Sequence, residues 1–90
     1  MAKVIYKYPV KMTDVFWLDL PGGFECLTVQ MRGGSPQMWV LVDPDNPTEA
    51  VRFRLFGTGH IHDEEAFNGV YIGTFQLEDG RLVFHLYVDV

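Results

Sequence analysis

The segment from Val70 to Val88 contains the feature that most limits what this chain can fold into. Two runs of alternating side chains, VYIGTFQL and RLVFHLYV, flank the tripeptide Glu78-Asp79-Gly80. An Asp-Gly pair between alternating strands is the strongest short-range signal for a β-hairpin, because both central residues of the tight turn take positive φ. We therefore predict that these two runs form an antiparallel hairpin.

The rest of the chain repeats the same pattern. Turn residues recur roughly every ten positions, which is typical of an all-β sandwich or barrel. Five further runs are expected to be strands: Lys3–Val10, Val15–Leu20, Phe24–Met31, Gln37–Asp43 and Val51–Phe56. The segment His62–Phe67 is the one short helical turn that we predict, with Asp63 as its cap. The 90 residues thus form a single all-β domain, a small antiparallel sandwich or open barrel of about seven strands.

The apolar content exceeds what one small core needs. Hydrophobic residues make up 48% of the chain and aromatic residues 14%. If Met38 and Val40 face the core, Trp39 between them faces outward, because neighbouring strand residues point to opposite sides. An exposed aromatic surplus in a small domain is typical of a partner surface or a ligand-stacking face. We expect a homo-oligomer, and we leave open whether these aromatics line a pocket or a subunit interface.

Charge and cysteine content exclude several classes of protein. The formal net charge is −5, whereas proteins that bind duplex nucleic acid usually carry a basic stripe. The single cysteine, Cys26, allows neither a disulfide within the chain nor a cysteine-rich zinc site. No apolar run approaches the ~18 residues of a membrane span. We expect a soluble, cytoplasmic protein that binds neither duplex nucleic acid nor membrane.

The stretch RLFGTGHIHDEE, Arg54 to Glu65, looks most like a functional site. Its Gly57-Thr58-Gly59 lacks the third glycine of a dinucleotide fingerprint and the lysine of a phosphate-binding loop. The favoured interpretation is a sharp turn at a strand end. An alternative is that successive backbone amides form a small nest for an anion.

The same stretch does not predict a metal or an enzyme. His60 and His62 have the spacing of two ligands on one strand face, but they fall in an expected loop without a third histidine or cysteine. Ser35 and Cys26 lack the neighbouring base of a catalytic nucleophile. We predict neither a metal site, a cofactor nor a catalytic function.

Arg52 and Arg54 alternate with core residues, so both guanidinium groups should leave the sheet on one face. The planar guanidinium group of arginine suits phosphate, because it can donate two parallel hydrogen bonds. The predicted site binds a small anionic or nucleotide-like ligand, with the remaining contacts supplied by Gly57, Thr58, Gly59, His60 and a stacking face from Trp39 or Tyr71. The opposing interpretation is that both arginines only pair on the surface with Asp43, Glu49 or Glu65.

Three segments resemble one family. They are KVIYKYPVKMTD, WVLVDPDNPTEAVRFRLFGTGH and the closing YIGTFQ with GRLVFHLY. Together they resemble small phage-encoded proteins of uncharacterised function, the DUF7352 type, over essentially the whole chain. His62 lies outside the family pattern, which further weakens the two-histidine metal hypothesis. The resemblance implies a phage accessory protein in the cytoplasm of an infected bacterium.

Two functions compete at this point. The first is a non-enzymatic host-defence antagonist that binds and sequesters a small nucleotide-like signalling molecule. The second is a protein–protein inhibitor of a host protein, or a minor phage assembly factor, without a ligand pocket. Both rest on analogy with what compact phage proteins do.

Overall fold

Strands account for nearly all regular structure in the computed structural model, which describes residues 2–89. The order of elements is β1 (Val4–Pro9), β2 (Val15–Pro21), β3 (Glu25–Arg32), β4 (Ser35–Val42), β5 (Thr48–Gly57), η1 (Glu64–Phe67), β6 (Val70–Leu77), η2 (Glu78–Gly80) and β7 (Leu82–Val88). The all-β prediction is confirmed. A second 3-10 turn, η2, adds to the one that the sequence predicted.

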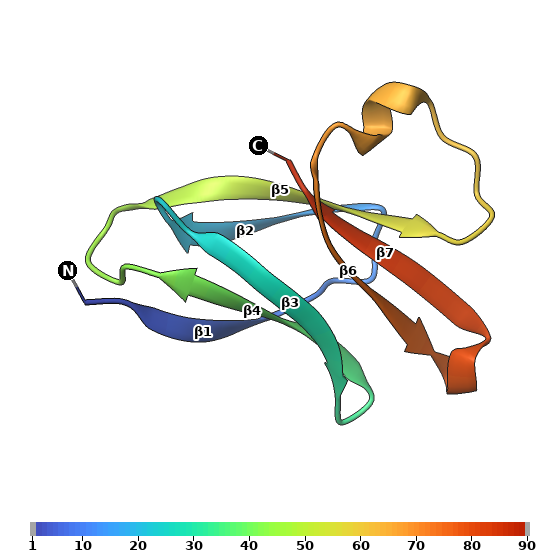
Figure 1. Cartoon of the computed structure of the whole chain (residues 1–90), viewed down its shortest axis with the longest axis horizontal. Coiled ribbons are helices and arrows are strands. Elements are labelled where there is room, and N and C mark those ends of the chain that lie inside the picture. Colours follow the sequence, from blue (N-terminus) through green and yellow to red (C-terminus); the bar gives the residue numbers. More distant parts are fainter. Residues whose placement is uncertain (1, 90) are drawn as a thin grey trace.

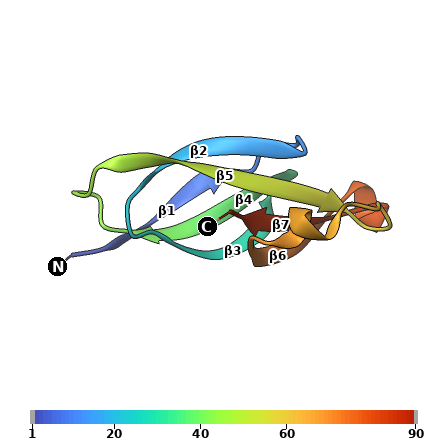
Figure 2. The same ribbon diagram turned by 90° about the horizontal axis from the view of Figure 1, so that it is seen from above.

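The strands form two antiparallel sheets. Sheet A has the order β1-β4-β3 and sheet B the order β2-β5-β7-β6. The chain alternates between them, since β1 belongs to sheet A, β2 to sheet B, β3 and β4 to sheet A, and the remaining strands to sheet B (Figure 1). Seen from above, β2 and β5 lie over β1 and β4 (Figure 2). The result is a flattened β-sandwich of 42 × 32 × 16 Å.

The core lies between the two sheets and follows the strand alternation. The fully buried side chains come from four strands: Leu20, Met38, Val40, Val42, Phe53 and Leu86. Phe16 stacks on Phe53 with ring centroids 5.1 Å apart. On β2 the alternation buries Phe16, so Trp17 points out of the sandwich and is 54% exposed. The predicted outward orientation of Trp39 is also confirmed, because Met38 and Val40 on either side of it are buried.

The facing edges of the two sheets meet where β3 passes β6. A Cβ atom added to Gly73 would lie 2.8 Å from Cγ1 of Val29, so only glycine permits this approach. Each strand also carries a register shift, between Cys26 and Thr28 on β3 and between Tyr71 and Gly73 on β6. Strict alternation would place Leu27 with Val29 in the core. The bulge instead leaves Leu27 40% exposed.

The hairpin of β6 and β7 confirms the strongest sequence signal. Leu77 pairs with Leu82 across the turn, and Asp79 and Gly80 have the expected positive φ of 56° and 88°. Glu78 also has a positive φ of 50°, and the amide of Arg81 donates to the carbonyl of Glu78 at 3.1 Å. The turn is therefore longer than the two-residue type, but the pairing of the strands is as predicted.

The segment between β5 and β6 folds back over the outer face of sheet B (Figure 1). Phe56 points outward from β5, yet it is 5% exposed, because Phe67 from η1 stacks on it at 4.3 Å. Tyr87 completes this cluster, edge-on to Phe56 at 5.2 Å. Asp63 stands at the N-cap position of η1, as predicted, but its side chain makes no capping hydrogen bond. Within residues 2–89, no helix has the length and apolar character needed to cross a membrane.

Candidate functional site

Arg52 and Arg54 leave β5 on the outer face of sheet B. Val51, Phe53 and Leu55, which alternate with them, are buried in the core. In the register with β2, Arg52 lies opposite Trp17 and Arg54 opposite Val15. The prediction that both guanidinium groups share one face is thus correct.

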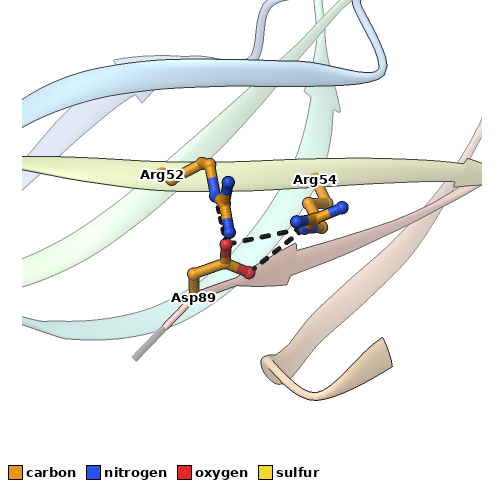
Figure 3. A network of polar contacts seen from close by, with 3 residues as sticks. All are labelled: Arg52, Arg54 and Asp89. Atoms are coloured by element: carbon orange, nitrogen blue, oxygen red, sulfur yellow. Dashed lines mark hydrogen bonds and ion pairs between the residues drawn. The ribbon is translucent and has the colours of Figure 1, made fainter. Parts of the chain in front are cut away.

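Both arginines converge on a single carboxylate, that of Asp89, just beyond β7 (Figure 3). Arg52 donates from Nε to Oδ2 of Asp89, and Nε of Arg54 lies 3.4 Å from Oδ1. The amide of Asp89 also donates to the carbonyl of Arg52 at 2.9 Å, which fixes the backbone beside the pair. The opposing interpretation, in which both arginines pair with a carboxylate, is correct, but the partner is Asp89 and not Asp43, Glu49 or Glu65. The buried Asp43 instead accepts a hydrogen bond from the amide of Asp45 at 3.0 Å.

Gly69 allows the end of β7 to reach this position. A Cβ atom at Gly69 would lie 2.5 Å from the carbonyl oxygen of Val88 and 3.2 Å from Oδ1 of Asp89. Real Cβ atoms do not approach a carbonyl oxygen as closely as 2.5 Å, so any larger residue at Gly69 would displace Val88 and, with it, Asp89. The loop that follows η1 thus helps to place the carboxylate between the arginines.

Two pockets adjoin at the Arg52–Asp89 pair. The first has a volume of about 230 Å³ and is lined by Arg52, Arg54, Glu65, Asn68, Gly69 and Asp89. The second has a volume of about 500 Å³ and is lined by Trp17, Phe24, Glu49, Ala50, Val51, Arg52 and Asp89. The guanidinium carbon of Arg52 lies 5.9 Å from the centre of the Trp17 ring, within cation–π range. One pocket is therefore mainly polar and charged, and its neighbour has aromatic walls.

The residues of the Gly-x-Gly turn lie away from the arginines. Gly57 is three positions along β5 from Arg54 and five from Arg52, roughly 10 and 17 Å at about 3.4 Å per residue. The amide of Thr58 donates to the carbonyl of Val83, and that of His60 to the carbonyl of Gly57. These amides are used within the chain, so the predicted backbone rim does not join the arginine site. Gly57, Thr58 and His60 instead line a separate pocket with residues 81–84.

Sequence reasoning missed a hydrogen-bonded chain around His85. Its Nε2 lies 2.7 Å from Oγ1 of Thr58, and its Nδ1 lies 2.9 Å from Oγ1 of Thr74. Thr74 in turn lies 2.6 Å from the hydroxyl of Tyr71. His85 pairs with Thr74 in the β6–β7 ladder and with Phe56 in the β5–β7 ladder. A strand histidine flanked by apolar residues gave no signal of this, since its partners are far away in the sequence.

The two proposed stacking residues lie on different sheets. Tyr71 is on the outer face of sheet B, edge-on to Tyr87 at 5.5 Å, and Tyr87 is paired with Arg54. Trp39 points outward from sheet A, paired with Lys7 and Thr28. The sandwich separates Trp39 from the arginines, so it cannot stack on a ligand that they hold. Trp17, which the sequence analysis did not select, takes that place beside Arg52.

Metal-ligating side chains do not gather into a metal centre in the described chain. Among residues 2–89, His, Cys, Asp and Glu do not gather in groups of three that suit a metal. His62 packs edge-on against Phe56 at 5.0 Å instead of joining His60. Burial raises the pKa of the Cys26 thiol to about 11, so it is a poor nucleophile at neutral pH.

Comparison with known proteins classifies the chain. A family model described as "Domain of unknown function (DUF7352)" matches residues 1–90. The chain belongs to this family. No curated protein and no solved structure shows significant similarity to it. The family description names no activity.

Proposed function

We propose that this DUF7352 domain is a non-enzymatic binding module for a small anionic, nucleotide-like ligand on the outer face of sheet B. One observation carries the proposal: two guanidinium groups from the same strand converge on one carboxylate (Figure 3), and this carboxylate lines two adjoining pockets. The carboxylate of Asp89 occupies the position that a phosphate group of the ligand would take.

The charges around the site define how such a ligand binds. Arg52 and Arg54 face Asp89 and Glu65 in the first pocket, so its formal charge is balanced. An anion therefore binds by displacing Asp89 from the arginines. Arg52 is 40% and Asp89 22% exposed in this pair, so solvent reaches it, and ion pairs that solvent reaches contribute on the order of 1 kcal/mol. A phosphate offers more acceptor oxygens than a carboxylate and two charges instead of one, which favours the exchange.

The biological role that fits such a module is sequestration. In this proposal the protein is phage-encoded and acts in the cytoplasm of the infected bacterium, where it withholds a nucleotide signal from host defence. The resemblance to small phage-encoded proteins supports the origin, and the paired arginines support the ligand class. The module needs no cofactor, because withholding a ligand requires only binding.

The test is a nucleotide panel measured by thermal shift and calorimetry. We expect at least one nucleotide to stabilise the wild-type protein and Arg54→Ala to weaken its binding by about tenfold or more, since charged hydrogen bonds contribute about 1.5–3 kcal/mol. Arg32→Ala is the matched control, because Arg32 is exposed at the end of β3 and lines none of these pockets. Asp89→Asn removes the competing carboxylate and should tighten binding. A panel without any stabilising nucleotide contradicts the proposal.

A second function is favoured by the outer face of sheet A. Ile5 is 52% exposed there and lies beside Leu41 in the β1–β4 ladder, and Leu41 is two positions from the outward-facing Trp39. An apolar sheet face of this kind suits a protein partner. A host protein or a phage assembly component would bind here without any ligand pocket. This function is preferred if nucleotides fail to bind.

A further inference from the structure

The larger pocket exists because β7 is shorter than β5. The ladder between them begins at the Phe53–Val88 pair, and the amide of Asp89 bonds to the carbonyl of Arg52. The earlier part of β5, from Thr48 to Val51, pairs only with β2. The side of β5 away from β2 therefore faces a notch of about 500 Å³. This volume lies within the range of small-molecule sites, about 300–1,000 Å³.

The walls of the notch suit a flat aromatic ring. Trp17 is 54% exposed, and the half-buried Phe24 lies on another wall. Arg52 lies against Trp17 and also lines the neighbouring pocket. A base stacked on an aromatic side chain gains about 1–3 kcal/mol. A ring in the notch is thus separated from the phosphate position at Arg54 only by the Arg52–Asp89 pair.

One carboxylate in the notch has no partner in the described chain. Glu49 lines it, is exposed, and makes no ion pair or side-chain hydrogen bond with residues 2–89. An ionised carboxylate only accepts hydrogen bonds and has two parallel oxygens. The edge of guanine presents an N1–H and a 2-amino N–H side by side, which match such a pair of acceptors. Adenine and cytosine offer a single amino group there, and uracil offers one N–H between two carbonyl oxygens that repel the carboxylate.

We infer that the notch formed by Trp17, Phe24 and Glu49 is the base subsite and that the ligand carries guanine. This rests on the proposed function, in which Arg52 and Arg54 hold the phosphate of the same molecule. The base enters the notch from the outer face of sheet B, where Trp17 provides the stacking face. Its edge points past β5 to the core side, where Glu49, the strand partner of Leu20, receives the two N–H groups of guanine. Ligand preference then depends on a residue that lies outside the arginine pocket.

The experiment compares the affinities of GMP, IMP and UMP for three proteins: the wild type, Glu49→Gln and Glu25→Gln. IMP lacks only the 2-amino group of GMP. The wild type should bind GMP about tenfold or more tightly than IMP, the discrimination expected for one contact of a bidentate pair. Glu49→Gln should lose most of this preference, because its amide offers one acceptor and one donor. Glu25→Gln, an exposed change on β3 outside the three pockets, should keep it.

The outcomes separate the two proposals. Equal binding of GMP, IMP and UMP, all weakened by Arg54→Ala, would overturn the guanine subsite and leave the anion site intact. A GMP preference that survives Glu49→Gln would also overturn the role of Glu49. Absence of binding to all three nucleotides overturns the base subsite, and failure of the wider panel overturns the anion site as well. Unchanged circular dichroism and melting temperature of Glu49→Gln exclude misfolding as the cause of a lost preference.

Discussion

At the scale of single residues, Cys26 illustrates how burial controls chemistry. Its side chain packs against the core, opposite Val40 on β4, and the pKa of the thiol is raised from 9.0 to about 11 by desolvation. At pH 8 the reactive thiolate should therefore be about 100-fold scarcer than for a free thiol. We expect iodoacetamide to modify the native protein about 100-fold more slowly than the denatured protein, as followed by mass spectrometry.

The same shift predicts the direction of a pH effect on stability. The folded protein keeps the Cys26 proton to a higher pH than the unfolded chain does. Its contribution to stability is complete below about pH 9 and is lost as the pH rises through 11. Rapid alkylation of the native protein at pH 8 would contradict the burial on which both expectations depend.

The arginine site shows which residue-level features a sequence can predict. Strand alternation was enough to place Arg52 and Arg54 on one face, because that depends on the backbone alone. Their partner was not predictable. Asp89 is 37 positions from Arg52 and meets it only because β5 pairs with β7. Trp17 was undervalued for the same reason, since its position opposite Arg52 follows from the β2–β5 register.

At the scale of elements, the crossing of β3 and β6 depends on a glycine. We expect Gly73→Ala to destabilise the protein by about 1–3 kcal/mol, because the added methyl group meets Val29 at 2.8 Å. Gly22→Ala is the control, since its new Cβ would meet nothing closer than 3.7 Å. Both free energies of unfolding are measured by urea denaturation.

A double-mutant cycle tests whether the contact between β3 and β6 causes the loss of stability in Gly73→Ala. Shortening Val29 to Ala makes room for the new methyl group, so the combined variant Gly73→Ala with Val29→Ala should lose less stability than the sum of the two single changes. If the two losses of unfolding free energy are strictly additive, the effect of Gly73→Ala does not come from its contact with Val29.

The hairpin next to this crossing was predictable from local turn chemistry, whereas the bulge at Leu27 was not, because the alternation of apolar residues continues through it.

At the scale of the whole molecule, the outer face of sheet A is where we expect copies to meet. Ile5 and Leu27 are 52% and 40% exposed on the two edge strands of this sheet. Light scattering coupled to gel filtration should show a dimer or larger species at high micromolar concentration. Ile5→Glu should shift it toward the monomer without changing the circular dichroism, because Ile5 lies outside the core. A wild-type monomer at that concentration contradicts this expectation.

The alternation of the chain between the two sheets has a consequence for how fast the protein folds. Among the strands that pair with each other, only β3 with β4 and β6 with β7 are joined by short turns. The first strand pairs with β4 and the second with β5, and each must remain unpaired until distant residues arrive. Closing such loops costs entropy before any contact compensates for it, and β-proteins of this kind fold in milliseconds to seconds. The two hairpins are therefore expected to form first, and β1 and β2 to dock last.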